Sequence, residues 1–295
     1  MNAPIVIFAY NRLAPFQRLI QSLKNCPEHS ASKLFIFIDG PKNNSDRLVI
    51  SQIREYAESI EGFESLYVEL SSINRGLGAS IIRGVSKIIN KYNQVIVLED
   101  DLVLHPMFLK YMNDGLSYYE NNNEVFSICG YTNKIIIPRD YNYNTYFCTR
   151  SSSWGWGTWK NRWNSVDWKL TDWDKYIKYK SKFNRWGGSD CFKMLNGWKY
   201  GHNHSWAIRF CFNQFLQDKV SLFPIKSLVA NTGFDGTGTN CKKWSRFKYE
   251  MMDQNNSEFD FPSDIIIDKY ILEQSLSYHS ILRRLYSRLM YLIYK

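Results

Sequence analysis

The chain has 295 residues, 44 % of them hydrophobic, and its 37 Lys and Arg against 28 Asp and Glu give a net charge of +9. This apolar content excludes global disorder. No apolar run approaches the roughly 20 residues of a spanning helix, and the start lacks the basic segment of a secretory signal. The six cysteines show no CxxC pair, which argues against structural zinc and predicts reduced thiols in a cytosolic protein.

The first third of the chain alternates buried strands with amphipathic helices. We predict strands over 5–10, 34–38, 66–70 and 94–98, with helices over 14–23, 45–59 and from the glycine-bearing loop 74–78 to about 89. Continuous apolar strands separated by helices are typical of an α/β fold with a mostly parallel sheet covered on both faces.

Each of these four strands is followed by polar residues. They are Tyr10-Asn11-Arg12, Asp39-Gly40, Asn74-Arg75-Gly76 and Glu99-Asp100-Asp101. Ligands of such sheets bind at the carboxyl ends of the strands. The sequence therefore predicts that the four ends converge on one crevice.

After residue 101 the pattern changes. Residues 108–119 and 187–218 favour helices and 125–129 a strand, while 231–238 form a loop rich in glycine and hydroxyl groups. All ten tryptophans lie between Trp154 and Trp244. The chain is therefore compositionally divided into two parts.

The Glu99-Asp100-Asp101 triplet is the strongest chemical signal. Three adjacent carboxylates at the end of a buried strand repel one another unless a cation neutralises them. Mg²⁺ and Mn²⁺ take oxygen ligands and often keep substrate phosphates, so one carboxylate can hold the metal when a diphosphate supplies the rest. The alternative is a solvated acidic loop.

The other strand ends suit a nucleotide. Side chains at Asp39, Asn11 and Arg12 could bond a base or ribose hydroxyls, although such residues are also common in turns and caps. Residues 74–78 open a helix, so their amides could bind an anion, although they form neither a GxGxxG fingerprint nor a P-loop. In this loop the candidate donor-binding residues are Asn74, Arg75 and Gly78.

The segment 153–159, Ser-Trp-Gly-Trp-Gly-Thr-Trp, sets tryptophans among small residues. This pattern can build a stacking platform for a sugar ring. Tryptophan is also often structural because it buries a large area, and we expect at least two of these side chains in the core.

Histidines and isolated aspartates supply the acid–base candidates. His202 and His204 are not a metal pair, because residues i and i+2 do not share a helical face. A histidine near the site is better suited to act as a base, since its pKa lies near neutrality. Asp190 and Asp235 are further candidates.

Residues 281–295 form a basic amphipathic pattern, with leucines and isoleucines on one helical face and arginines on the other. Two roles stay open for this helix. It could rest on an anionic membrane surface, or it could pack back on the domain or on a second subunit.

In their order along the chain, these motifs resemble those of a bacterial GT-A (Rossmann-like) glycosyltransferase, family 2-like and related to animal N-acetylglucosaminyltransferase I. The resemblance runs from about residue 5 to 241. Besides the strand ends and 153–159, it rests on residues 187–190 (Gly-Gly-Ser-Asp), 205–209 (Ser-Trp-Ala-Ile-Arg), 227–229 (Ser-Leu-Val) and 233–239 (Gly-Phe-Asp-Gly-Thr-Gly-Thr).

The resemblance implies inverting transfer of a sugar from a nucleotide-sugar, with UDP as the carrier. It implies that Asp101 holds Mn²⁺ or Mg²⁺, that Glu99 and Asp100 contact the donor sugar or ribose, and that Asp39 reads the uracil. The metal would stabilise the leaving diphosphate. The residues predicted to bind the acceptor are Trp154, Trp156 and Trp206.

One position departs from the family pattern. Relatives carry an Asp just before Ser-Trp-Ala-Ile-Arg, where this chain has His204. We predict His204 as the base that deprotonates the acceptor hydroxyl. The alternatives are Asp190, Asp235 or a weakened activity.

The sequence thus predicts a hexosyl- or N-acetylhexosaminyltransferase that extends a lipid-linked glycan in bacterial O-antigen or capsule synthesis. Residues 1–120 would bind the donor and 121–250 the acceptor, while the 251–295 tail would rest on the inner face of the plasma membrane. The alternative is a non-catalytic sugar- or nucleotide-binding module. A nucleic-acid-binding function is disfavoured, because this sequence lacks the usual nucleic-acid-binding motifs and its acidic triplet would repel phosphates.

Overall fold

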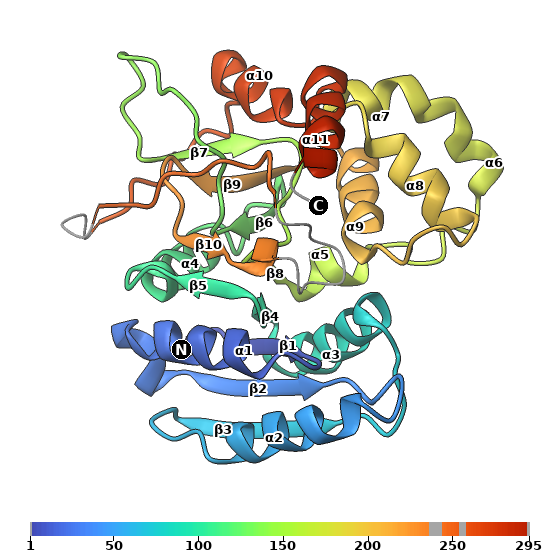
Figure 1. Cartoon of the computed structure of the whole chain (residues 1–295). Helices are drawn as coiled ribbons and strands as arrows, with labels where there is room; N and C mark the ends of the chain where they lie inside the picture. The colour runs from blue at the N-terminus through green and yellow to red at the C-terminus, as the bar shows by residue number, and fades with distance from the viewer. Residues whose placement is uncertain (1, 236–243, 254–257, 294–295) are drawn as a thin grey trace.

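The computed structural model describes residues 2–235, 244–253 and 258–293. Its centre is one eight-stranded mixed sheet in the order β3–β2–β1–β4–β8–β6–β9–β7 (Figure 1). The strands are β1 (Ile5–Ala9), β2 (Lys33–Ile38), β3 (Ser65–Leu70), β4 (Gln94–Glu99), β6 (Val125–Cys129), β7 (Thr145–Cys148), β8 (Trp156–Trp159) and β9 (Val220–Pro224). The strands β1 to β4 are parallel, and β6 and β9 share their direction. A separate antiparallel pair joins β5 (Leu102–Leu104) to β10 (Val229–Asn231).

Helices cover both faces of this sheet, which confirms the predicted α/β class. The α-helices are α1 (Leu13–Lys24), α2 (Asp46–Glu58), α3 (Leu77–Tyr92), α4 (Phe108–Tyr118), α5 (Lys160–Asn164), α6 (Trp173–Tyr176), α7 (Lys180–Gly187), α8 (Cys191–Lys199), α9 (Trp206–Leu216), α10 (Lys269–Ser277) and α11 (Ile281–Ile293). The 3₁₀ turns are η1 (Pro27–Ala31), η2 (Ile177–Tyr179) and η3 (Gly233–Asp235).

The strands bury alternate side chains on opposite faces. Ile5 and Ile7 of β1 pack in one core cluster with α1, α2 and α4, whereas Val6 and Phe8 pack in a second cluster with α3 and α9. This alternation follows from the two-residue period of a strand. A third cluster joins α6 to α9 and forms the Trp-rich lobe beside the sheet (Figure 1).

The register of the parallel strands brings their carboxyl ends to one edge. Ala9 pairs with Ile38, Ile38 with Leu70, and Phe8 with Glu99. The residues that follow β1, β2, β3 and β4 therefore leave the sheet side by side. The four polar strand ends thus share one edge of the sheet, and their convergence on a single crevice stays a prediction.

The second half of the sheet differs from the prediction. Residues 156–159 form β8, an inner strand between β4 and β6, and neither β7 nor β9 was predicted. These strands are only four or five residues long, and their partners lie far away in sequence, so pattern alone does not define them. The predicted boundaries at residues 120 and 250 stay predictions, but strands from both sides of residue 120 share this one sheet.

Candidate active site

The acidic triplet lies where β4 leaves the sheet. Glu99 ends β4, and Asp100 and Asp101 form the turn into β5, with exposed fractions of 5 % and 7 %. Burial and then the two neighbouring carboxylates raise the pKa of Glu99. Burial also raises the pKa of Asp100 to about 6, although a nearby guanidinium opposes the rise. The triplet therefore holds more negative charge than its surroundings stabilise.

That guanidinium belongs to Arg12, which directly precedes α1. Its Nη2 donates to Asp100 Oδ1 and, at 3.0 Å, to Asp101 Oδ2. Arg12 Nη1 and Asp101 Oδ1 are buried and have no hydrogen-bond partner in the described part of the chain. One positive group thus faces three carboxyl groups, and a buried carboxylate oxygen is left over. A further positive charge would balance this arrangement.

Gly233 lies directly against the Asp101 carboxylate. Thr232, just before it, donates through its backbone N and its Oγ1 to the Asp101 backbone oxygen at 2.8 and 2.9 Å. A Cβ at Gly233 would lie 2.3 Å from Asp101 Oδ2, so a side chain at this position would collide with the carboxylate. Glycine is therefore required by the close approach of η3 to the acidic turn.

The residues present fit a divalent cation that takes few ligands from the protein. Asp101 offers an unpaired buried oxygen. Within the described ranges, no three His, Cys, Asp or Glu side chains are grouped as a complete metal cage. An ion held here would take its remaining ligands from a diphosphate and water, as Mg²⁺ and Mn²⁺ commonly do.

Asp39 fixes the loop in front of α3. Its carboxylate accepts hydrogen bonds from the backbone N of Gly40, Arg75 and Gly76 at 3.0, 2.9 and 2.8 Å. The Asn74 amide donates to the Gly40 carbonyl at 2.9 Å. The structure thus joins the β2 end to the β3 end and gives Asp39 a structural task. Its contact with a uracil stays a prediction.

Asn11 contacts a carboxylate outside the acidic triplet that sequence reasoning missed. Asn11 Nδ2 donates to Asp46 Oδ1 at 2.9 Å, and the Tyr10 hydroxyl donates to Asp46 Oδ2 at 2.6 Å. Burial and this hydrogen bond raise the pKa of Tyr10 to about 12. Asp46 lies in the first turn of α2, where an acidic residue looked like ordinary helix chemistry, so the sequence carried no signal for its role.

His204 lies beside the first turn of α3. A Cβ at Gly78 would lie 2.3 Å from the His204 carbonyl oxygen, so the loop before α9 rests on the helix at this glycine. Ser205 caps α9, with its Oγ accepting from the Ile208 N at 3.3 Å. The His204 ring is exposed and takes no hydrogen bond from the described residues. The ring is therefore open to solvent beside the start of α3.

Asp190 is enclosed in an ion pair. Its Oδ1 accepts from Arg150 Nη1 at 2.7 Å, and His279 Nδ1 lies 3.8 Å from its Oδ2, too far for a hydrogen bond. Burial alone would raise the pKa of Asp190, but the Arg150 charge lowers it well below its ordinary value. Such a carboxylate is a poor proton acceptor, so the geometry favours a structural role over the predicted catalytic one.

The three predicted acceptor tryptophans do not lie together. Trp156 and Trp206 are 1 % and 4 % exposed and stack on each other, with ring centroids 4.8 Å apart, inside the core. Neither offers a face to a sugar, which corrects that prediction. Trp154 is half-buried and meets the rings of Tyr131 and Phe234 at centroid distances of 4.5 and 5.8 Å. Since Phe234 follows Gly233, Trp154 lies near the acidic turn.

Asp235 is the last residue of η3, but its side chain lies outside those that the structure describes. Its predicted role as a base stays a prediction. Sequence reasoning also missed Arg150, because a single arginine between a strand and the Trp-rich segment carries no pattern.

The mixed sheet, whose parallel part ends in a buried acidic turn after β4 backed by a glycine loop, makes this α/β fold GT-A-like. The family model described as "Glycosyl transferase family 2" matches residues 5–196. The chain belongs to this family. No match was found among curated proteins. The finer likeness to N-acetylglucosaminyltransferase I stays a prediction.

Solved structures give distant likenesses. TarS 1–349 of S. aureus aligns with 13 % identity over 80 % of this chain and 62 % of its own, at a TM-score of 0.45. The complex of TarS 1–349 with UDP-GlcNAc aligns over 49 % of this chain and 38 % of its own, at 13 % identity and a TM-score of 0.34. The mannosyltransferase PcManGT of Pyrobaculum calidifontis, in complex with GDP-Man and Mn²⁺, shares 9 % identity over 55 % and 46 %, at a TM-score of 0.34. The chain thus spans less than two thirds of each of these proteins.

Proposed function

We propose that this chain is a metal-dependent, inverting glycosyltransferase that moves a hexosyl or N-acetylhexosaminyl group from a UDP-sugar to a glycan. The observation that carries the proposal is the Asp101 carboxylate. It is buried at the meeting point of the strand ends, has one unpaired oxygen and is backed by Gly233. A buried anion with a free lone pair is the form of site that a cation completes.

In this function, residues at different strand ends bind different parts of the nucleotide-sugar. Asp101 would hold Mn²⁺ or Mg²⁺, and the bound ion would supply Lewis-acid stabilisation of the leaving diphosphate. Arg12 keeps Nη1 free to donate to a phosphate oxygen. The amides at the start of α3, held by Asp39, suit an anion as well. Glu99 and Asp100 would contact the donor sugar or ribose.

The reaction itself needs one base. The acceptor hydroxyl oxygen attacks the donor C1 from the face opposite the diphosphate, the C1–O bond to the diphosphate breaks, and the hydroxyl proton passes to the base. We assign this task to His204, because its ring is exposed and unpaired beside α3, whereas Asp190 is neutralised by Arg150.

The base is tested by comparing neighbouring histidines. His204→Ala should lose about 10²–10⁴-fold in turnover and keep its donor affinity, because general-base catalysis contributes about that much. His202→Ala is the matched control, since it removes an exposed imidazole two residues away. Turnover by His204→Ala equal to that of His202→Ala would reject the assignment.

A non-catalytic sugar- or nucleotide-binding module is the second candidate, favoured by the absence of the usual Asp before Ser-Trp-Ala-Ile-Arg. A thermal-shift screen of nucleotide sugars with Mn²⁺ identifies the donor under either function through ligand linkage. Hydrolysis or transfer of that donor with Mn²⁺, lost in EDTA, supports the enzyme. Binding without turnover of the donor supports the module.

For the acceptor we propose a lipid-linked glycan of bacterial surface polysaccharide synthesis, met on the cytoplasmic membrane face. Trp154 supports a sugar acceptor, since its half-buried ring lies beside Phe234 near the acidic turn. Trp154→Ala should raise the KM for the acceptor without changing donor affinity. An unchanged KM would remove Trp154 from the acceptor site.

A further inference from the structure

Helix α11 packs on the protein through its polar side. Arg284 Nη1 donates to Ser189 Oγ at 3.1 Å, Ser287 is 1 % exposed, and the Tyr291 ring lies 6.0 Å from that of Trp244. Arg283 covers the ring of Tyr278 at 4.0 Å. These inward-facing residues recur at helical spacing and occupy one face. The helix is therefore docked on its domain, but by the side that an ordinary surface helix turns to water.

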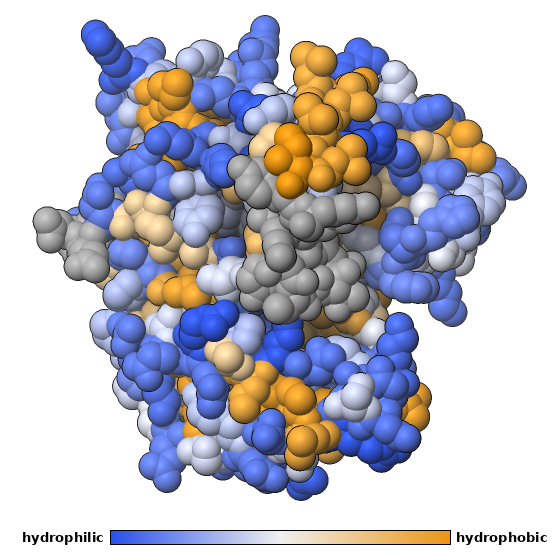
Figure 2. Space-filling view, in the orientation of Figure 1, coloured by the Kyte–Doolittle hydropathy of each residue, from blue (hydrophilic) through white to orange (hydrophobic). Residues whose placement is uncertain are grey.

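The opposite, apolar face of α11 is exposed. More than half of the surface of each of its large hydrophobic residues is open, and Leu282 reaches 80 %. In Figure 2 the corresponding hydrophobic atoms gather at the upper edge of the molecule, over α11. We call this surface the α11 face; its residues are Ile281, Leu282, Leu285, Leu289, Leu292 and Ile293. Tyr286 is also exposed, but its ring lies 5.7 Å from that of Trp244 and borders the docked side.

Such a continuous apolar face marks a binding surface rather than a chance exposure. No described helix is both long and apolar enough to cross a bilayer.

The charge of the segment decides between a lipid surface and a second copy of the chain. Residues 274–295 contain four Arg and Lys residues and no acidic residue. Arg283 and Arg284 contact the protein, whereas Arg288 is exposed. Two copies paired through the α11 face would bring two positively charged helices together, with no acidic residue on either helix to neutralise Arg288. Anionic lipid headgroups offer the opposite charge beside an apolar layer.

We infer that α11 lies in the plane of an anionic membrane surface, with the α11 face in the headgroup–acyl boundary and the exposed Arg288 at the phosphates. One part of this inference rests on the proposed function and deepens it: the membrane would bring the active site to a lipid-linked acceptor. Membrane binding itself follows from the helix.

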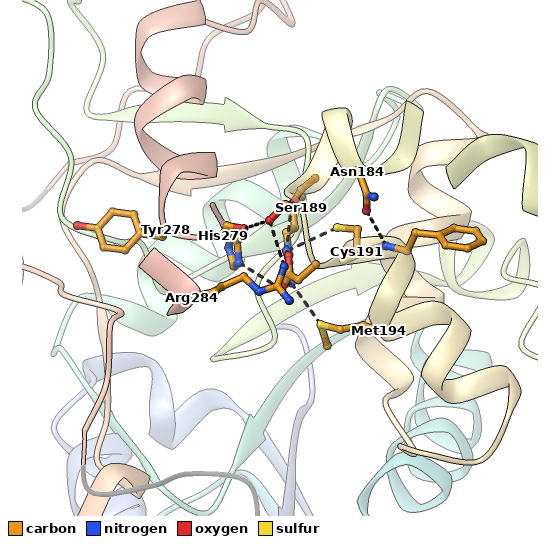
Figure 3. Close-up of polar contacts among 12 residues, drawn as sticks. Asn184, Ser189, Cys191, Met194, Tyr278, His279 and Arg284 are labelled. Atoms are coloured by element: carbon orange, nitrogen blue, oxygen red, sulfur yellow. Dashed lines mark hydrogen bonds and ion pairs between the residues drawn. The ribbon is translucent and has the colours of Figure 1, made fainter. Parts of the chain in front are cut away.

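The contacts beneath α11 tie the membrane helix to the acceptor side of the molecule. Arg284 and the His279 carbonyl both bond Ser189 Oγ, and the next residue, Asp190, pairs with Arg150 (Figure 3). Arg150 opens the segment that carries Trp154. A membrane-bound α11 would therefore hold this segment in a fixed position near the bilayer.

The test is co-sedimentation of the full chain with vesicles of phosphatidylcholine alone and of phosphatidylcholine with phosphatidylglycerol. We expect binding to the anionic vesicles that weakens with salt, and a loss of about tenfold or more in Leu285→Glu/Leu289→Glu. The matched control is Leu48→Glu/Ile177→Glu, which places the same charges at exposed apolar residues elsewhere and should bind as the parent chain does.

Two results would overturn the inference. One is that the parent chain and Leu285→Glu/Leu289→Glu sediment equally with anionic vesicles, or that neither of them sediments with the vesicles. The other is a dimer in analytical ultracentrifugation that these substitutions dissociate, with no vesicle binding by the parent chain. Binding of nucleotide sugar by thermal shift is measured on every variant in solution, so failure of the membrane inference stays distinct from failure of the proposed enzyme.

Discussion

Two buried arginine–aspartate contacts, one in each half of the molecule, have opposite character. Arg12 faces Asp100 and Asp101 after β4 and leaves Asp101 Oδ1 and its own Nη1 unpaired. Arg150 faces Asp190 with two nitrogens on two oxygens, at 2.7 and 3.3 Å. The first contact is incomplete and the second is closed.

The charges show the same difference. At the acidic turn burial prevails, and the pKa of Asp100 rises to about 6. Under α11 the arginine prevails over burial, and the pKa of Asp190 falls well below its ordinary value. A carboxylate cluster left short of positive charge suits a ligand, whereas a matched pair suits support of the fold.

The largest effect is expected at the incomplete contact. Asp101→Asn keeps the shape of the side chain but removes the charge that would hold the metal, so transfer should fall by about 10³-fold or more. Folding should be unchanged or slightly improved, because a repelled carboxylate is lost. Initial rates and thermal unfolding check this, with exposed Asp140→Asn as the control. Full Mn²⁺-dependent activity in Asp101→Asn would end the metal assignment.

The closed pair should act on stability instead. Arg150→Met leaves the Asp190 charge buried without its partner and should lower the free energy of unfolding by about 3–5 kcal/mol. Arg150→Met/Asp190→Leu should recover most of that loss, because no lone charge remains. Denaturant unfolding of both variants measures it. If the single variant were as stable as the parent, the pair would not support the fold.

His279, beside the closed pair, should make stability depend on pH. Burial and then the Arg150 charge lower its pKa to about 4, against about 6.5 in an unfolded chain. The unfolded state thus binds the extra proton first, so stability falls as pH drops from about 6.5 to 4, by about 3 kcal/mol. His279→Gln should lose less stability than the parent over this window. Parallel pH profiles of thermal unfolding would contradict the assignment.

The smallest effect is expected when the arginine of the incomplete contact is removed. Arg12→Gln should lower the free energy of unfolding by about 1 kcal/mol at pH 7, because Asp100, whose pKa is already raised, can take up a proton instead. The rate of sugar transfer should fall by a larger factor than the folding equilibrium constant, since the diphosphate loses the Arg12 guanidinium as a hydrogen-bond donor. The same denaturant titration as for Arg150→Met gives the comparison. A loss as large as that of Arg150→Met would mean that the two contacts do not differ.

The first half of the fold followed directly from the sequence. Apolar runs bounded by polar residues located β1 to β4, and their parallel arrangement placed the polar strand ends at one edge. The contact of Arg12 with Asp101 was visible only in the structure. The partners of Asp39 and Asn11 were not predictable. They are backbone amides of another loop and Asp46 on another helix, and no local pattern records such contacts.

The tryptophans show why composition fell short in the second half. Residues 153–159 suggested a sugar platform, yet Trp156 belongs to β8 and is buried against Trp206. Trp154 lies in the bend before β8, where Gly155 has a φ of +65°, so the period of the strand does not extend to it and the two tryptophans do not share a surface. Trp154 alone of the three predicted acceptor tryptophans stays a candidate.

The sequence by itself determined that residues 281–293 make a helix with one apolar and one basic face, because side-chain spacing on a helix is local. It could not determine which face meets the protein. That depended on Ser189, Tyr278 and Trp244, which receive the polar side. The net charge of +9 likewise followed from counting, but the tertiary structure placed an acidic turn at the edge where the strands end and an apolar face beside Arg288 on the outside.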